Sequence, residues 1–171
     1  NLVTANAMSP VLAISKQQEI YLAGSFTGTY DFDPGTGVVN LIANGGDDIV
    51  VQKLNAGGQL LWAKSIGSTG NDKAGDIRVD TLGNLYLSGS FKSSMDADPG
   101  SGSVVLNSHG SDDIFLVKWN SNGSLQYATS FGGSSEDRSN GLWMDSLHAV
   151  YLTGYFVGTM DLDPGLPVVT T

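Results

Sequence analysis

The chain has 171 residues, no cysteine and a formal net charge of −9. The lack of cysteine excludes disulfides, thiolate metal sites and a cysteine nucleophile, and the scattered eight Lys and Arg residues argue against nucleic-acid binding. No apolar run approaches the ~20 residues of a membrane span, so we expect no membrane insertion.

Glycine, with 23 residues, and aspartate are abundant, and no segment has a sustained helical period of apolar residues. Both residue types are unfavourable inside helices and favourable in turns. The composition therefore predicts an all-β protein.

One motif, Asp-x-Asp-Pro-Gly, occurs at residues 31–35, 96–100 and 161–165, at identical intervals of 65 residues. The strand-like segments before it, residues 21–26, 86–91 and 151–156, recur in the same register without insertion or deletion. A fixed period of this length indicates a tandem array of one supersecondary unit.

The array divides the chain into residues 1–67, residues 68–132 and a partial third unit at residues 133–171, about 2.6 units in all. Because the sequence begins and ends inside a unit, we expect it to be a segment of a longer protein.

The second unit gives the expected elements in chain order. A short strand around Ile77 and Val79 alternates apolar and polar residues, and a turn at 81–84 leads into a strand at 85–91. A connection with the Asp-x-Asp-Pro-Gly motif follows, and we expect a short extra strand at 103–106.

The third main strand, residues 113–119, is apolar on both faces, which is typical of a strand buried between two layers. Asn122-Gly123 predicts a tight hairpin turn into a last strand at 125–131, which Gly132-Gly133 ends.

Four short strands per unit, joined mostly by hairpin turns, predict the four-stranded antiparallel blades of a β-propeller. The three stretches above are then blade one, blade two and partial blade three of a larger ring. A β-solenoid is the competing architecture, but its parallel strands and short coils do not suit the Asn-Gly hairpin or the 65-residue period.

Three stretches of the second unit carry a family resemblance: residues 83–89, 112–120 and 131–137. They resemble the bacterial SBBP-type β-propeller repeat. The Asp-x-Asp-Pro-Gly variant is similar to blades of large surface proteins exported by the type IX secretion route. The resemblance implies an extracellular or cell-surface location and no single activity. The first unit has Gln18-Glu19 in place of the Gly-Asn turn, so we expect that turn to differ.

Alternating strand directions place the Asp-x-Asp-Pro-Gly loops on one face, together with residues 67–72 and 132–137. The turns at 80–82 and 145–147 then lie on the opposite face with Asn122-Gly123.

Paired carboxylates in the motif could bind Ca²⁺, because residues i and i+2 of an extended segment point the same way and Ca²⁺ prefers oxygen ligands. The alternative is a turn in which each Asp accepts backbone N–H bonds. The candidate metal ligands are Asp31, Asp33, Asp96, Asp98, Asp161 and Asp163.

Two other features repeat. Asp48 and Asp113 begin the apolar strand, and we expect them to hydrogen-bond the backbone or a neighbouring blade. Thr81 and Ser146 lie in Asp-Ser/Thr-aliphatic triplets that resemble O-glycosylation sites of bacteria with type IX export.

Catalysis finds little support, so we assign no catalytic residue and no cofactor other than the Ca²⁺ alternative. His109 and His148 are not repeated, and no nucleophile elbow, metal-binding histidine pair or phosphate loop occurs.

The sequence thus predicts a non-enzymatic, extracellular β-propeller scaffold or adhesion segment. Its expected partners are the remaining blades and other surface proteins or glycans. A Ca²⁺-dependent carbohydrate- or ligand-binding propeller stays open, as does part of a propeller enzyme, such as a polysaccharide lyase or hydrolase, with its active site in other blades.

Overall fold

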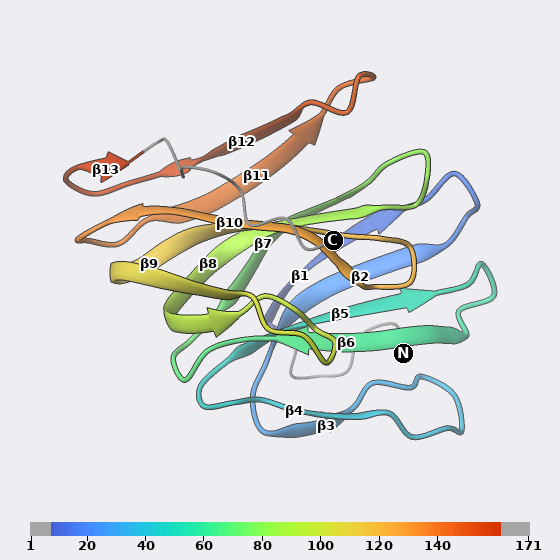
Figure 1. The fold of residues 1–171 in the computed structure, drawn as a ribbon. Helices are drawn as coiled ribbons and strands as arrows, with labels where there is room; N and C mark the ends of the chain where they lie inside the picture. The colour runs from blue at the N-terminus through green and yellow to red at the C-terminus, as the bar shows by residue number, and fades with distance from the viewer. Residues whose placement is uncertain (1–7, 162–171) are drawn as a thin grey trace.

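The structure of the chain, a computed structural model, describes residues 8–161, which form β-sheets joined by turns and loops (Figure 1). All strand pairs in this part of the chain are antiparallel, and it contains no helix. The all-β prediction is confirmed. Over the same residues, no helix is available that could cross a bilayer.

The described chain contains thirteen strands. In chain order they are β1 (Met8–Ile14), β2 (Ile20–Phe26), β3 (Thr29–Asp31), β4 (Asn40–Ile42), β5 (Asp48–Leu54), β6 (Leu60–Ile66), β7 (Lys73–Val79), β8 (Leu85–Asp96), β9 (Val105–Trp119), β10 (Leu125–Gly133), β11 (Arg138–Met144), β12 (Val150–Tyr155) and β13 (Met160–Asp161).

The first sheet has the strand order β1-β2-β5-β6. Its third strand, β5, is buried along its whole length, as its continuous apolar run predicts. The hairpin β3–β4 leaves this sheet and carries the first Asp-x-Asp-Pro-Gly loop. A small core of Phe26, Phe32 and Val50 holds it against β2 and β5.

The second sheet repeats this order with β7-β8-β9-β10 and adds β13 at its outer edge. Here the expected short strand at 103–106 is not separate: the pairing of β8 with β9 continues beyond Lys92 and Asp112 into Ser94 and Asn107. The two strands therefore form one long ribbon, because backbone bonds bridge a stretch whose side chains are mostly polar.

The third unit contributes the pair β11–β12, while its β13 pairs with β10 of the second sheet at Gly132 and Asp161. The equivalent contact one unit earlier is a single bridge between Gly67 and Asp96. The second and third Asp-x-Asp-Pro-Gly strands thus reach back to the outer edge of the preceding unit.

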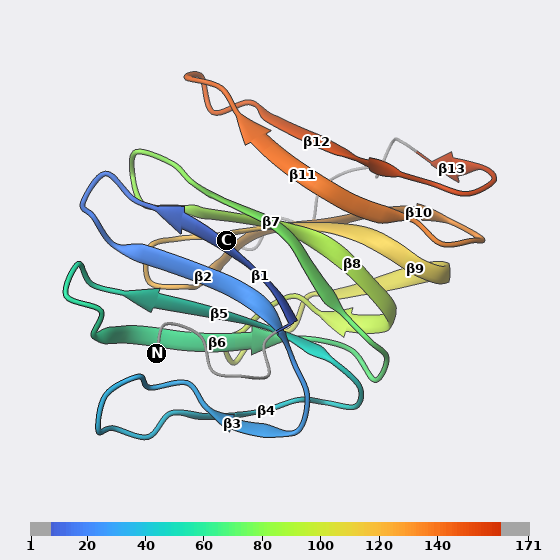
Figure 2. The same cartoon turned by 180° about the vertical axis from the view of Figure 1, so that it is seen from behind.

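The first strands of the three units, β1, β7 and β11, lie side by side, and the sheets spread apart from them (Figures 1 and 2). Each of these strands contains an irregularity at the same position: between Met8 and Val11, between Ala74 and Asp76, and between Ser139 and Gly141. Such β-bulges bend a strand and increase its twist.

The main core fills the space between the first and second sheets. Tyr21, Ile77 and Trp119 are completely buried there, and Trp62 packs against them with its ring 6.4 Å from that of Trp119. Polar contacts seal one end, where Trp62 Nε1 and Lys53 Nζ donate to the carbonyl oxygen of Ser121. Successive sheets therefore bury each other's faces.

The turn between the first two strands is the same in all three units. The residue pairs Ser15/Glu19, Asp80/Asn84 and Asp145/Ala149 each form its closing backbone bond, and Gln18, Gly83 and His148 each have a positive φ. The expectation that the turn at Gln18-Glu19 differs is therefore wrong, because Gln18 adopts the left-handed conformation that Gly83 adopts one unit later.

Candidate functional site

The first Asp-x-Asp-Pro-Gly loop uses its carboxylates to hold its own backbone. Asp31 Oδ1 accepts hydrogen bonds from the N–H groups of Asp33 (3.0 Å) and Val39 (2.8 Å), and Asp33 Oδ1 accepts one from Gly35 (2.8 Å). These bonds lower the pKa of Asp31 because they stabilise its charged form.

The second loop repeats this network. Asp96 Oδ1 accepts from Asp98 and Val104 at 3.0 and 2.9 Å, and Asp98 Oδ1 accepts from Gly100 at 2.8 Å. In the third loop Asp161 ends β13, and Asp163 lies outside the described residues.

The candidate calcium ligands thus serve as turn-forming acceptors in both loops whose side chains are described. Within residues 8–161 the structure brings no group of three His, Cys, Asp or Glu side chains close enough to hold a metal ion. The calcium hypothesis therefore stays a prediction.

Buried carboxylates lie where each unit meets the next. Asp72 Oδ1 accepts hydrogen bonds from Ser68 Oγ and from the backbone N–H of Lys92, at 2.9 and 3.0 Å. Asp137 accepts from the backbone N–H groups of Gly133 and Val157 in the same way. These acids therefore fasten the linker between units to the start of the next Asp-x-Asp-Pro-Gly segment.

Asp48 and Asp113 are also buried, and each lies directly over a glycine of the linker. A Cβ atom added to Gly67 would lie 2.2 Å from Asp48 Cγ, and one added to Gly132 would lie 2.1 Å from Asp113 Cγ. Each Oδ2 accepts one backbone N–H, from Asn44 or His109, while each Oδ1 has no partner. The expected backbone role of both acids agrees with these bonds.

The exposed turns at the other end of the strands carry Thr81 and Ser146. Both side chains face solvent, and Thr81 Oγ1 lies 3.5 Å from His148 Nε2 of the next unit. Equivalent turns are therefore neighbours, and both hydroxyl groups are accessible.

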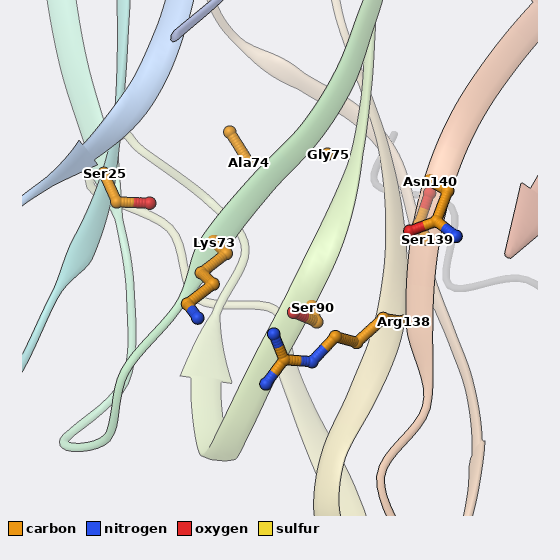
Figure 3. A pocket seen from close by; sticks show the side chains of 8 residues that line it. All are labelled: Ser25, Lys73, Ala74, Gly75, Ser90, Arg138, Ser139 and Asn140. Atoms are coloured by element: carbon orange, nitrogen blue, oxygen red, sulfur yellow. The ribbon is translucent and has the colours of Figure 1, made fainter. Parts of the chain in front are cut away.

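A pocket that the sequence did not reveal lies between the inner strands β7 and β11 and the end of β2. It has a volume of about 300 Å³. Its lining is Ser25, Lys73, Ala74, Gly75, Ser90, Arg138, Ser139 and Asn140 (Figure 3).

The pocket combines two of the eight basic residues of this acidic chain. Lys73 begins β7 and Arg138 begins β11, at the same position of the repeat, and both side chains extend toward the same end of the pocket (Figure 3). Arg138 Nη2 donates to Asp112 at 3.0 Å, and Arg138 Nε lies 2.8 Å from Glu136.

Neighbouring polar groups complete this site. Ser139 Oγ donates to Ser88 Oγ at 2.8 Å, and Tyr155 donates its hydroxyl proton to Glu136. That bond, with the charge of Arg138, lowers the pKa of the Glu136 carboxyl. Ammonium, guanidinium, hydroxyl and amide groups therefore line this cavity together with apolar surface such as that of Ala74, a mixture that is common in small-molecule sites.

Sequence reasoning missed Lys73 and Arg138 because neither lies in a motif. Both residues occupy the same position of the repeat, which was the available clue. That position predicts a shared site only once the inner strands β7 and β11 are known to lie side by side. Arg78 and Trp143 also share a repeat position. Arg78 pairs with Asp76 at 2.8 Å, and Trp143 is exposed.

No family model matches the chain. The uncharacterized WD repeat-containing protein L264 of Acanthamoeba polyphaga mimivirus is 30% identical over 133 residues, which are 72% of this chain and 10% of that protein. The regulatory protein FlaEY of Caulobacter vibrioides is 26% identical over 110 residues, 64% of this chain and 12% of that protein. The chain therefore spans only about a tenth of the length of these relatives.

Proposed function

We propose that the chain is a non-enzymatic scaffold or adhesion segment of a β-propeller in a larger extracellular or cell-surface bacterial protein. The observation that carries this proposal is the repeated four-stranded antiparallel sheet whose first strand packs against the first strand of the next unit. Four-stranded sheets arranged around a common axis are the blades of propellers, which include WD-repeat proteins.

Two features support a scaffold over an enzyme. Successive sheets bury each other's faces, which is how repeat arrays gain stability from their neighbours. The buried acids Asp48, Asp72, Asp113 and Asp137 repeat from unit to unit and bind backbone groups of their own junctions. A residue that repeats in this way supports every junction equally, whereas an active site usually depends on one set of residues.

The arrangement is tested by an experimentally determined structure of the chain. We expect one rotation axis, close to β1, β7 and β11, to relate the successive sheets. Sheets related by translation alone would indicate a solenoid and contradict the propeller.

The non-enzymatic role is tested with a panel of neutral and acidic polysaccharides. We expect the chain to release neither reducing ends nor unsaturated sugars. Turnover that disappears in Lys73→Ala or Arg138→Ala would overturn the scaffold role. Cell fractionation of the source organism tests the surface location, which a cytosolic pool alone would contradict.

A ligand-binding propeller is the second candidate, and the pocket beside Lys73 and Arg138 favours it. Its mixed lining suits acidic sugars, whose carboxylates could pair with Lys73. We expect Lys73→Ala to weaken the binding of an acidic oligosaccharide in calorimetry, with Lys16→Ala, an exposed turn residue, as the matched control. Equal affinities of both variants would remove this candidate.

A further inference from the structure

Strand β12 has a neighbour on one edge only among the residues that the structure describes. It pairs with β11, whereas its equivalents β2 and β8 pair on both edges, with β5 and β9 on the second side. The open edge of β12 therefore occupies the place where the other two units have their third strand.

The side chains of this hairpin are exposed where their equivalents are buried. Phe156 is 54% exposed, while Phe26 and Phe91 are 1% and 0% exposed. Tyr151 is also 54% exposed, whereas Tyr21 is completely buried. The sequence thus places aromatic residues at the same positions in all three units. Among the described residues, these side chains are buried in the first two units and exposed in the third.

An apolar pocket of about 280 Å³ lies along the open edge. Apart from Thr153 and Gly154, its lining is aromatic or aliphatic: Ile114, Phe131, Leu152, Tyr155, Phe156 and Met160. In the second unit, Phe115 of β9 occupies the corresponding place. It is buried over Gly89, the equivalent of Gly154, and its ring centroid lies 6.3 Å from that of Phe91.

The register of the two complete sheets specifies the missing neighbour. In both, an Asp lies opposite the phenylalanine, as in Phe26/Asp48 and Phe91/Asp113. An apolar residue lies opposite the glycine, as Phe115 lies opposite Gly89. Transferred by 65 residues, these pairs place an Asp opposite Phe156, and an apolar residue opposite Gly154.

Charge gives a further requirement. Lys53 lies over the ring of Tyr21, and Lys118 over that of Tyr86, with Nζ to centroid distances of 5.2 and 5.1 Å. The same register puts a Lys opposite Tyr151, whose hydroxyl donates to the exposed carboxylate of Asp145 at 3.2 Å. A cation there has both an aromatic face and an anion to contact.

We propose that the open edge of β12 binds an antiparallel strand of the pattern Asp-Ile-apolar-apolar-x-Lys or a close variant, supplied by a further unit of this same repeat from outside residues 1–171. The third residue of that strand fills the apolar pocket. This is strand addition, in which backbone bonds give affinity and alternate side chains give specificity.

A second folded copy of residues 1–171 cannot supply this strand. Within the described structure, the two strands with the pattern, β5 and β9, are each paired on both edges. The occupant must therefore carry a strand that is not already committed to its own sheet. Binding of a strand at this edge depends only on the repeat and its register. It does not depend on whether the molecule works as a scaffold.

The test adds a peptide to the 171-residue chain. The peptide has the sequence of residues 112–133 with the single substitution Trp119→Phe. This range contains the equivalent of the missing third strand together with its hairpin partner. We expect saturable 1:1 binding in calorimetry, with NMR shift changes concentrated in β12 and around the apolar pocket. A peptide with Phe115→Ala should bind at least about tenfold more weakly because it leaves the pocket empty.

A matched pair of protein variants locates the site. Phe156→Asp should weaken binding at least about tenfold, whereas Leu147→Asp, the same chemical change on the exposed turn of this hairpin, should leave affinity unchanged. If Phe156→Asp perturbs the circular dichroism spectrum, the peptide with Phe115→Ala still decides the question. No binding, binding unaffected by either change, or a dimer of the chain formed through β12 without peptide would overturn the proposal.

Discussion

A single carboxyl group shows how the junctions between units depend on protonation. Asp48 is buried against Gly67, its Oδ2 accepts one backbone N–H, and its Oδ1 has no partner. Burial raises the pKa of Asp48 from 3.8 to about 6, and the nearby carboxylates of Asp72 and Asp47 add to the shift. The charged form is therefore less favourable in the folded protein than in the unfolded chain.

This predicts a pH dependence of known sign. Between pH 3.8 and about 6 the folded protein holds a proton on Asp48 that the unfolded chain releases, so its contribution to stability falls as pH rises through that window. Asp48→Asn, which cannot ionise, should gain about 1–3 kcal/mol over the wild type on going from pH 4 to pH 7. Urea unfolding at both pH values measures this, and an equal difference at both would contradict it.

The two acids of the Asp-x-Asp-Pro-Gly loop predict unequal effects. Both side chains are half-buried, but Asp96 accepts hydrogen bonds from two backbone N–H groups, whereas Asp98 accepts one. Asp96→Ala should therefore cost about 1–3 kcal/mol of unfolding free energy, and Asp98→Ala less than about 1 kcal/mol. Urea unfolding of both variants tests the order.

Thermal unfolding of the wild type and of Asp98→Ala, with calcium and with a chelator, tests the metal hypothesis. If the carboxylates serve only the turn, chelation leaves the melting temperature of the wild type unchanged. A calcium-dependent rise that Asp98→Ala abolishes would instead establish the loop as a calcium site.

At the scale of elements, the repeated first turn shows that geometry persists where sequence changes. Gln18 and His148 have φ values of 63° and 64°, and the equivalent residue of the second unit is Gly83 at 83°. A non-glycine residue in this left-handed region of φ and ψ destabilises the folded state by about 1 kcal/mol, whereas glycine is unstrained there. The strain is local because neighbouring strands fix the turn.

Gln18→Gly should therefore stabilise the protein by up to about 1 kcal/mol. Gln17→Gly is the matched control, because Gln17 has no positive φ and a glycine there only adds freedom to the unfolded chain. The two variants should differ in sign in urea unfolding, and loss of stability in both would show that Gln18 makes a contribution beyond its backbone.

The close contact between a strand and the following linker predicts a coupled pair. In Gly132→Ala the added Cβ would meet the carboxyl of Asp113 at 2.1 Å, so we expect a loss of about 1–3 kcal/mol. Asp113→Ala should relieve this clash. The double variant should therefore lose less unfolding free energy than the sum of the losses in the two single variants. Strict additivity in this double-mutant cycle would contradict the contact.

The same scale shows what sequence could predict. β2, β5 and their equivalents were predictable because apolar runs recur in register, and the hairpin turn at Asn122-Gly123 has its own residue signature. The β8–β9 ribbon was not, because Ser94 and Asn107 are paired by backbone bonds and by a polar side-chain bond rather than by a recurring apolar pattern. The pocket at Lys73 and Arg138 also escaped prediction, since only the packing of β7 against β11 unites them.

At the scale of the whole molecule, stability is expected to be uneven along the array. The first and second sheets enclose the main core, whereas within residues 8–161 strand β12 of the β11–β12 hairpin has an open edge, and Tyr151 and Phe156 are exposed. Local stability follows buried contacts and paired backbone. The isolated chain is thus expected to lack the closed, uniformly protected character of a complete ring.

Native-state hydrogen exchange tests this gradient. The amides of β12 should exchange at least about tenfold faster than those that join β8 to β9. Mild denaturant should release β11 and β12 before the first two sheets. Equal protection throughout, with one cooperative transition, would show that the chain is a self-sufficient folding unit.

The backward reach of the second and third Asp-x-Asp-Pro-Gly strands has a mechanical consequence. Because Asp96 bridges to Gly67 and Asp161 pairs with Gly132, the second and third units are each bonded to the outer edge of the unit before them. A pulling force along the polypeptide must therefore break these backbone contacts before the outermost strand of a unit can separate. We therefore expect tension along the chain to be shared between adjacent units.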